Sequence, residues 1–393
     1  MRAALNPFNP GSGLRPPALV GRATEIEAFE VTIERTAREL PSRGLILSGL
    51  RGVGKTVLLN ELRRRAEDAN WFVVSLEARP DEAGASSARE TLAREVTAQA
   101  RQFTRSRLTD KVKAALSTVS AFNAKIGPGG IDLGVQIARG RADSGQIEVD
   151  LPELVQDLCA ALSEEGRAFG LFIDELQDLD PDLLRALLVT QHQAGQRGWP
   201  FYLIGAGLPH LPGVLAEARS YAERLFDYRT IAQLPRAEAT KALTDPVVQH
   251  DVTFEPSALQ LLLDASAGYP YFLQEYGRAA WDVAPGPGIT KEDAHDAVIL
   301  GLQRLDAGFF RARWDRATRS ERRMLIAMAA DVEGPSSSSE VARRMEIRPS
   351  SLGPYRASLI GKGLVYAPEH GKVAYTVPGM SDYVHRHRED FDV

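Results

Sequence analysis

The fold is decided by one octapeptide, Gly49-Leu50-Arg51-Gly52-Val53-Gly54-Lys55-Thr56. It matches the pattern G-x-x-x-x-G-K-[ST] in full. Such a loop needs glycine, because the chain must pass through positive φ for successive backbone N–H groups to face one anion. An apolar strand, Leu45–Leu47, precedes the loop, and the spacing of Val57–Ala69 predicts a helix after it. The alternative is a chance glycine-rich turn, but the full match between a strand and a helix favours a phosphate-binding loop.

Each position of this loop predicts a role. We expect the backbone around Gly49, Gly52, Val53 and Gly54 to enclose the phosphates of a nucleotide, aided by the dipole of the following helix. Lys55 is expected to reach the β- and γ-phosphates and to take part in catalysis, and the Thr56 hydroxyl is expected to ligate Mg²⁺. The pattern therefore predicts ATP or ADP, with Mg²⁺, as the ligands.

Strands and helices alternate along the first part of the chain, which indicates an α/β fold with a parallel sheet. After Leu45–Leu47, the apolar runs that predict further strands are Trp71–Leu76, Phe169–Ile173, Phe201–Ile204 and Tyr228–Ile231. The helices predicted between them are Thr24–Leu40, Val57–Ala69, Ser87–Phe103, Leu151–Ser163 and Leu183–Gln193.

Two carboxylates, Asp174 and Glu175, follow directly after the strand Phe169–Ile173. Residues at the carboxyl ends of parallel strands face the ligand crevice. We expect Asp174 to bind Mg²⁺ through water, and Glu175 to stay free for proton transfer as the general base that polarises the attacking water. The alternative is an ordinary strand-to-loop junction with solvated acids. Gln177, Asp178 and Asp180 are expected to be loop and cap residues.

Composition limits the classes of protein that fit. The chain has 393 residues, which predicts two or three domains. Its formal net charge of −5 does not predict nucleic-acid binding for the chain as a whole. The single cysteine, Cys159, excludes an internal disulfide, and the apolar runs are too short to cross a membrane. Without an apolar core of signal-peptide length near the start, the sequence favours a cytoplasmic protein.

Four regions follow from the pattern of breaks and helices. Residues 1–17 are rich in proline and glycine and predict an extended arm. Residues 18–235 form the expected core, with an insertion at about 104–150 that holds a predicted helix, Leu108–Phe122, and a predicted strand, Ile131–Ile137. Residues 236–319 are expected to be a helical lid, whose predicted helices are Arg236–Leu243, Glu255–Ala265, Tyr271–Trp281 and Lys291–Gly308.

The segment 320–393 predicts a winged-helix domain. Its three helices are expected at Glu321–Ala330, from a capping box at Ser337–Glu340 through Met345, and at Ser351–Lys362. A hairpin is expected around His370-Gly371, from Leu364–Ala367 to Val373–Val377. Basic and acidic residues balance in this segment, so contact with DNA and use as a protein-interaction or lid module both stay open. The face that would meet DNA comprises Arg343, Arg344, Arg348, Ser350, Ser351, Tyr355, Arg356 and Lys372.

The loop and the acidic strand end resemble those of AAA+ and STAND ATPases, specifically the origin-recognition-like ATPases of archaea and actinobacteria. The resemblance extends from Leu19 to about His387. It implies that Val20 and Gly21 contact the adenine and that Arg22 helps to fix the nucleotide. It also implies that Pro270, in Gly268-Tyr269-Pro270, packs near the nucleotide, although a simple helix-initiating turn is an equal alternative.

The resemblance further implies a catalytic arginine that faces the γ-phosphate. Arg224 occupies the matching region, with Arg219 and Arg229 as nearby competitors and a surface arginine as the alternative. The chain departs from the family after the strand Phe201–Ile204, where residues 205–207 are Gly-Ala-Gly and offer no polar side chain to orient the lytic water. Slow hydrolysis, or help from another group such as Gln177, is therefore expected.

The sequence thus predicts an ATP-binding, ATP-hydrolysing molecular switch in which nucleotide state sets the arrangement of lid and winged helix. The alternative is an ATP-gated DNA-binding protein with little turnover. A kinase-like phosphotransferase is a third possibility, which the Asp174-Glu175 pair and the winged helix argue against. ATP is the expected ligand, DNA or a protein is the expected partner of the winged helix, no membrane contact is expected, and the oligomeric state stays open.

Overall fold

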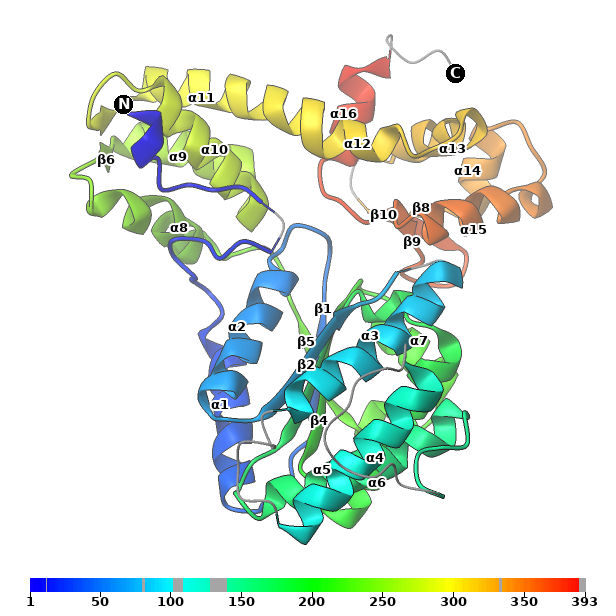
Figure 1. The fold of residues 1–393 in the computed structure, drawn as a ribbon. Coiled ribbons are helices and arrows are strands. Elements are labelled where there is room, and N and C mark those ends of the chain that lie inside the picture. The colour runs from blue at the N-terminus through cyan, green and yellow to red at the C-terminus, as the bar shows by residue number, and fades with distance from the viewer. Residues whose placement is uncertain (12, 80–81, 102–108, 128–139, 332–333, 389–393) are drawn as a thin grey trace.

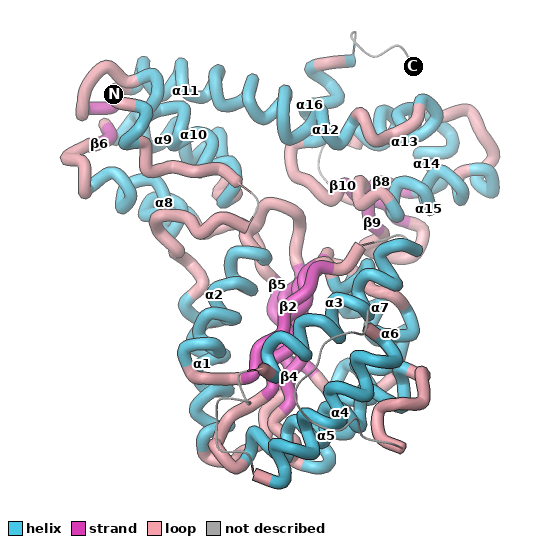
Figure 2. Tube along the Cα trace, viewed as in Figure 1, coloured by secondary structure: helices cyan, strands magenta, loops and turns pink. Residues whose placement is uncertain are grey.

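The computed structural model describes residues 1–11, 13–79, 82–101, 109–127, 140–331 and 334–388. Figure 1 shows a sheet-containing core below two helical groups, which the long helix α11 (Lys291–Arg304) joins across the top. The chain enters the upper groups only after completing the core, apart from its first residues, which lie among the lid helices. This arrangement leaves the carboxyl ends of the core strands facing the two upper groups (Figure 2).

The core holds a five-stranded parallel sheet in the order β2-β3-β4-β1-β5. Its strands are β1 (Gly44–Ser48), β2 (Phe72–Glu77), β3 (Phe169–Asp174), β4 (Phe201–Gly207) and β5 (Phe226–Thr230). Most of their residues are buried, as expected for a parallel sheet covered on both faces. The predicted strands are confirmed, although the last one begins two residues before the predicted Tyr228.

Helices cover both faces of this sheet. They are α1 (Ala23–Ala37), α2 (Lys55–Asp68), α3 (Glu82–Ala100), α4 (Asp110–Ile126), α5 (Ile147–Ser163), α6 (Pro181–Arg197) and α7 (Leu211–Ala218). Leu116, Val119 and Phe122 of α4 lie in the same apolar cluster as strands β2 to β4. The described part of the predicted insertion is therefore built into the core layer. The predicted strand Ile131–Ile137 lies outside the described residues.

The lid region contains α8 (Arg236–Val248), α9 (Pro256–Ser266), α10 (Pro270–Val283) and α11, with the short parallel pair β6 (Thr253–Phe254) and β7 (Gly288–Ile289). A capping box of Thr290 and Asp293 begins α11. The helix does not stop at the predicted Gly308. It continues through a π-helical segment, η5 (Leu305–Phe310), into α12 (Arg311–Trp314).

The C-terminal region has the element order α13 (Arg319–Ala329), β8 (Ser336–Ser337), α14 (Ser338–Arg344), α15 (Gly353–Gly361), β9 (Val365–Tyr366), β10 (Lys372–Tyr375) and α16 (Met380–Arg386). Its antiparallel strands pair in the order β8-β10-β9. A short 3₁₀ turn, η6 (Pro349–Ser351), separates α14 from α15. The 3₁₀ turns in the other regions are η1 (Ala3–Leu5), η3 (Leu176–Asp178) and η4 (Ala222–Arg224). The helix α16 was not predicted.

The predicted capping box at Ser337–Glu340 is wrong. Ser337 makes no side-chain capping bond to α14, and its hydroxyl lies 2.8 Å from that of Ser339. Glu340 accepts two hydrogen bonds from Arg343 instead of reaching back to the helix start. The reason is that residues 336–337 are extended and paired with β10, so the strand fixes the entry into α14. A real capping box begins α13, where Thr318 and Glu321 exchange hydrogen bonds.

Glu321 also joins two helices of this region. Its carboxylate accepts hydrogen bonds from Ser358 Oγ at 2.5 Å and from Lys362 Nζ at 2.6 Å. Burial raises the pKa of Glu321, but these partners and the backbone N–H of Thr318 outweigh burial and lower the pKa to about 2. The carboxylate therefore stabilises the fold at neutral pH. This contribution is complete above the ordinary glutamate pKa of about 4.5 and is lost as the pH falls towards about 2.

We expect Glu321→Gln to lower the free energy of unfolding by about 1–3 kcal/mol at pH 7, because Lys362 loses its charged acceptor. The deficit relative to the native protein should shrink as the pH falls from about 4.5 towards about 2, because the carboxyl group takes up its proton more readily in the unfolded chain than in the native protein. Denaturant unfolding across this range measures both effects. The control is Glu369→Gln, because Glu369 is exposed and pairs only at 3.3 Å with Lys372. A deficit that stays constant with pH would contradict the prediction.

The predicted N-terminal arm packs on the lid. Phe8 is 3% exposed and lies in one apolar cluster with lid residues, close against Gly277 of α10. Trp281 Nε1 donates a hydrogen bond to the carbonyl of Arg2 at 3.0 Å. The same cluster continues into the C-terminal region through Met324 and Val341, so lid and C-terminal region share one core. Among the described residues, no helix is long and apolar enough to cross a membrane.

Candidate nucleotide-binding site

The phosphate-loop sequence lies at the carboxyl end of β1 and runs directly into α2. Gly52 and Gly54 have φ of +86° and +92°, which the backbone reaches only with glycine at low cost. A Cβ at Gly49 would lie 2.1 Å from the carbonyl oxygen of Ile231, so this position has no room for a side chain. The predicted geometry of the loop is therefore present, and each glycine has a local reason.

Lys55 is the first residue of α2 and is only 6% exposed. Its Nζ donates a hydrogen bond to the carbonyl of Leu50 within the loop at 2.9 Å. Burial lowers the pKa of Lys55 to about 8, against the opposing effects of Glu175 and Asp174. An anion bound in the loop would favour the charged form again, so the lysine is poised to meet negative charge.

Thr56 and Asp174 meet at the base of the loop, although they are distant in sequence. Thr56 Oγ1 donates a hydrogen bond to Asp174 Oδ2 at 2.6 Å. Asp174 ends β3, and its other oxygen accepts the backbone N–H of Glu175 at 2.9 Å. The structure thus brings together the two residues for which the sequence predicts magnesium ligation.

Glu175 is not free, contrary to the expectation for a general base. Its Oε1 accepts a hydrogen bond from Arg51 Nη1 at 2.6 Å, and its Oε2 accepts one from Gln177 Nε2 at 2.7 Å. The backbone of Glu175 also has a φ of +49°, which is unfavourable for any residue other than glycine. The predicted freedom of Glu175 is therefore wrong for this state, because an arginine of the phosphate loop occupies the carboxylate.

Gln177 fills the place left by the small residues at the end of β4. Its Oε1 accepts the backbone N–H of Leu208 at 3.0 Å, while its Nε2 also donates to Asp178 at 2.9 Å. A Cβ at Gly207 would come within 2.3 Å of Gln177 Oε1. The absence of a polar side chain at 205–207 thus makes room for an amide from the neighbouring strand end. Burial, and next Glu175, raise the pKa of Asp178 to about 6.

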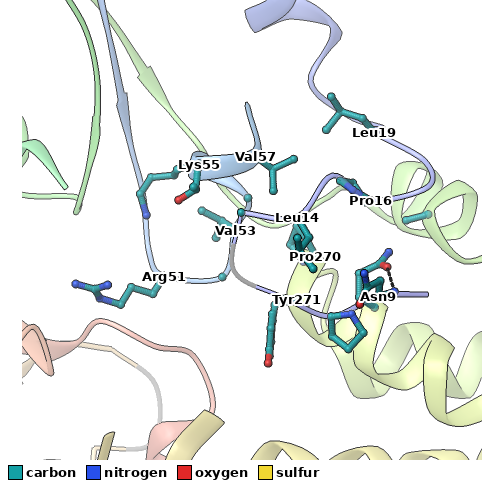
Figure 3. Close-up of a pocket in the computed structure, with 18 of the residues that line it drawn as sticks. Asn9, Leu14, Pro16, Leu19, Arg51, Val53, Lys55, Val57, Pro270 and Tyr271 are labelled. Carbon is teal, nitrogen blue, oxygen red and sulfur yellow. Dashed lines mark hydrogen bonds between the residues drawn. The ribbon is translucent and has the colours of Figure 1, made fainter. Parts of the chain in front are cut away.

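A cavity of about 420 Å³ opens over the loop. Figure 3 shows Lys55 and Arg51 at one side of it and Leu14, Pro16 and Pro270 at the other. Val20 and Leu19 line the same cavity, as does Tyr271. One end is therefore cationic and the other largely apolar, as a nucleotide with a charged tail and a flat base requires.

The arm contributes to the apolar end, which the sequence did not indicate. Its residues lining the cavity are Asn9, Pro10, Gly11, Gly13, Leu14 and Pro16. Asn9 N–H donates to Gln274 Oε1 of the lid at 3.3 Å, so the arm is tied to α10 at the cavity wall. A proline- and glycine-rich arm carries no periodic pattern, and only its ordered course across the lid shows its place.

The tripeptide Val20-Gly21-Arg22 is divided between two tasks. Val20 lines the cavity, and Gly21 at φ of +67° packs against Leu234, which a Cβ would approach to 2.8 Å. Arg22 Nη2 donates to the carbonyls of Val53 and Ala232 at 2.9 and 2.7 Å. Through these two carbonyls, Arg22 joins the phosphate loop to the residues that follow β5.

Pro270 begins α10 and lines the cavity from the lid side. Gly268, at φ of +73°, lies so close to Leu234 that a Cβ would be 2.4 Å from its carbonyl oxygen. The next residue, Tyr271, donates its backbone N–H to the carbonyl of Gly52 at 3.3 Å and stacks its ring on Phe309 at 4.7 Å. The Gly-Tyr-Pro turn therefore joins the lid to the phosphate loop.

Comparison with known families identifies this region. A family model described as an AAA ATPase domain matches residues 18–204. Residues 18–204, slightly less than half of the chain, are therefore similar to an AAA ATPase domain. A second model, described as a domain of unknown function, matches residues 307–384. No curated protein matches the chain in sequence.

Solved structures extend the likeness beyond the AAA ATPase domain. The Walker-type ATPase of Pyrococcus abyssi is 15% identical, with 97% of this chain and 99% of that chain covered and a TM-score of 0.61. The Aeropyrum pernix ORC2 protein in its ADP form is 13% identical, with 98% of each chain covered and a TM-score of 0.52. At these identities the likeness shows the fold alone. The predicted α/β fold, a P-loop parallel sheet followed by a helical region, is confirmed.

The region around the phosphate loop fits a magnesium ion. The Thr56 hydroxyl and the Asp174 carboxylate are hard oxygen donors 2.6 Å apart, next to a loop shaped for phosphate. In the described part of the chain, no group of three or more His, Cys, Asp or Glu side chains could hold a metal by itself.

Arg224 lies away from the cavity of its own chain. It is exposed in η4, just before β5, whose first residue pairs with Gly44 at the amino end of β1. The phosphate loop follows Ser48 at the opposite edge of the sheet. The prediction that Arg224 faces the γ-phosphate is therefore wrong within one chain. The competitors are also engaged, because Arg229 pairs with Asp227 at 2.6 Å and Arg219 lies 3.7 Å from Glu148.

The cations of the expected DNA-binding face are mostly paired within the chain. Arg344 makes two hydrogen bonds of 2.6 Å to Asp331, and Arg343 pairs with Glu340. Arg356 donates to the carbonyl of Lys372, whose own Nζ lies 3.3 Å from Glu369. A phosphate backbone would have to compete with these carboxylates, so the electrostatic term that supports DNA binding is weak here.

Proposed function

We propose that the chain is an ATP-binding and ATP-hydrolysing molecular switch of the AAA+/STAND type. The observation that carries the proposal is the convergence of four segments on one cavity. The arm, the phosphate loop, the lid turn at Pro270 and the segment at Gly308–Arg313 all line it. A nucleotide bound there would contact the arm, the core and the lid at once. Its binding or hydrolysis would therefore bias how these regions pack.

The proposed regions follow the sequence divisions. We assign residues 18–235 to the ATPase core, 236–319 to the lid and 320–393 to a winged-helix module. The three-stranded sheet and the helices α13 to α15 of the last region support this assignment. The backbone N–H of Arg51 donates to the carbonyl of Thr376 at 2.9 Å, so this module touches the phosphate loop directly. We favour intramolecular use of the module over DNA contact, because Arg343, Arg344 and Lys372 are paired with carboxylates of the same chain.

Each residue of the site has a proposed role in hydrolysis. Backbone N–H groups around Gly52 and Gly54, with Lys55, bind the β- and γ-phosphates. Thr56 and Asp174 would hold Mg²⁺, which would neutralise charge on the phosphate oxygens when bound. Glu175 accepts a proton from the attacking water once Arg51 has released it, and Gln177 orients that water or its base. Val20, Gly21 and Pro270 form the wall against the base.

The proposal is tested by titrating the purified protein with ATP and Mg²⁺ in a calorimeter and by measuring phosphate release. We expect saturable binding of one ATP per chain and slow turnover, because Glu175 is paired. Absence of binding at millimolar ATP would overturn the proposal. Binding without phosphate release would remove the enzymatic part and leave a nucleotide-gated protein.

Arg51→Ala should raise the rate of phosphate release by about fivefold, because losing an ion pair worth about 1 kcal/mol makes Glu175 available as a base. The pair is partly exposed, at 27% for Arg51 and 18% for Glu175, which limits its strength. Steady-state phosphate release at saturating ATP measures the effect. The control is Arg64→Ala, an arginine of α2 paired with Glu61 and Asp68. A slower rate in Arg51→Ala would show that Arg51 assists catalysis.

A further inference from the structure

Arg313 stands out among the residues of the cavity. It lies in α12, its guanidinium carbon is 3.9 Å from the centre of the Phe309 ring, and its Nη1 donates to the carbonyl of Phe309. Among the described residues, no carboxylate lies within ion-pair distance of Arg313. Burial, and next the neighbouring charge of Arg51, lower the pKa of Arg313 to about 10. A cation held this way is stabilised by the ring but not neutralised.

The charges that line the cavity are unbalanced. Its charged residues are Arg22, Arg51, Lys55, Arg313 and Glu175. Arg22 is engaged by backbone carbonyls and Arg51 Nη1 by Glu175, which leaves Lys55 and Arg313 without a carboxylate of their own. Arg51 Nε is buried and has no hydrogen-bond partner in the described structure. Two cations without a carboxylate partner and one buried donor without an acceptor would be stabilised by an anionic ligand.

A π-helical turn in the backbone directly before α12 helps to direct Arg313 into the cavity. The preceding turn, Leu305–Phe310, is π-helical, and such turns occur often at functional sites because they change the direction of the side chains that follow. Gly308 and Phe309 of this turn also line the cavity. Since Phe309 stacks on Tyr271, whose N–H is bonded to Gly52, the aromatic pair fixes Arg313 relative to the phosphate loop.

We propose that Arg313 binds the β- and γ-phosphates of the nucleotide together with Lys55. This inference rests on the proposed nucleotide-binding function and adds a phosphate ligand that the loop motif does not contain. Arg313 lies in the segment 307–384, which matches the domain of unknown function. In this proposal the first helix of that segment, α12, senses the phosphate charge and transmits it to the module 320–393.

The proposal is tested by measuring the affinities of ATP, ADP and AMP, each with Mg²⁺, for the full chain by calorimetry. We expect Arg313→Ala to bind ATP and ADP about tenfold to a hundredfold more weakly, as the loss of a charge-assisted hydrogen bond predicts, and AMP within about twofold of the native protein. Arg313→Lys should regain part of the loss. The matched control is Arg311→Ala in the same helix, because Arg311 is exposed and pairs with Asp315.

Two results would overturn the proposal. Arg313→Ala with native affinity for ATP and ADP would show that the guanidinium does not meet the phosphates. An equal loss for AMP, ADP and ATP would show that Arg313 only holds the cavity in shape, and thermal unfolding of the variant would show any general damage. If the native protein itself bound none of the three nucleotides, the proposed function would fail first, which distinguishes the two failures.

Discussion

Replacing Lys55 with alanine will weaken ATP binding by about a hundredfold and reduce phosphate release to background. The ammonium of Lys55 is buried at the first turn of α2, beside the loop whose glycines direct N–H groups at an anion. Its removal would delete the proposed charge-assisted contact to the β- and γ-phosphates, worth about 2–3 kcal/mol. Calorimetric titration with ATP and Mg²⁺ measures the loss.

The control for this substitution is Lys241→Ala, because Lys241 is an exposed lysine of α8 paired with Glu238 at 3.0 Å. It should bind ATP as the native protein does. The native protein should also lose affinity for ATP as the pH rises above about 8. The pKa of Lys55 in the ligand-free protein is about 8, and a neutral amine does not attract the phosphate charge. Unchanged binding by Lys55→Ala would mean that the loop holds no phosphate.

Glu175→Gln will lower the rate of phosphate release by about a hundredfold or more while leaving ATP affinity nearly unchanged. The substitution keeps the shape of the side chain and its place beside Gln177, but the amide cannot accept a proton from water. The ion pair with Arg51 at 2.6 Å is also lost, so free Arg51 can move toward the phosphates and preserve binding. Single-turnover hydrolysis separates the chemical step from binding.

The matched control is Glu165→Gln, an exposed carboxylate that pairs with Arg167 at 2.8 Å and precedes the amino end of β3. It tests whether removing one negative charge near the other end of β3 matters in itself. Equal phosphate release from Glu175→Gln and the native protein would exclude Glu175 from the mechanism. Gln177, held between Glu175 and Leu208, would then be the next residue to replace.

Local features explain why so much of the fold could be predicted. The apolar runs at β1 to β4 read as buried strands because both faces of a parallel sheet are covered. The lid helices were predicted from their spacing. The π-helical turn at Leu305–Phe310, whose Phe309 stacks on Tyr271, was not predicted. The capping box at Ser337 was wrongly predicted because strand pairing with β10 overrides the local pattern.

The candidate site divides along the same line. Gly49 to Thr56 and the pair Asp174-Glu175 could be found in the sequence, because positive φ at Gly52 and Gly54 and a carboxylate at a strand end are requirements of single positions. The orientation of Arg224 could not be found this way. Arg224 lies far from the cavity because it comes just before β5, at the edge of the sheet opposite the phosphate loop. The pairing of β5 with β1 decides this, and that pairing is a property of the assembled sheet.

The sequence by itself determined the phosphate loop, because an octapeptide of fixed spacing is enough to shape a backbone around an anion. Only the tertiary structure decided what holds the site in its present state. Arg51 and Glu175 are 124 residues apart and meet at 2.6 Å, Gln177 lies against Gly207, and Arg313 reaches the cavity from α12 at the end of the lid. Contacts between distant segments depend on how whole layers pack, and no local pattern of residues encodes that packing.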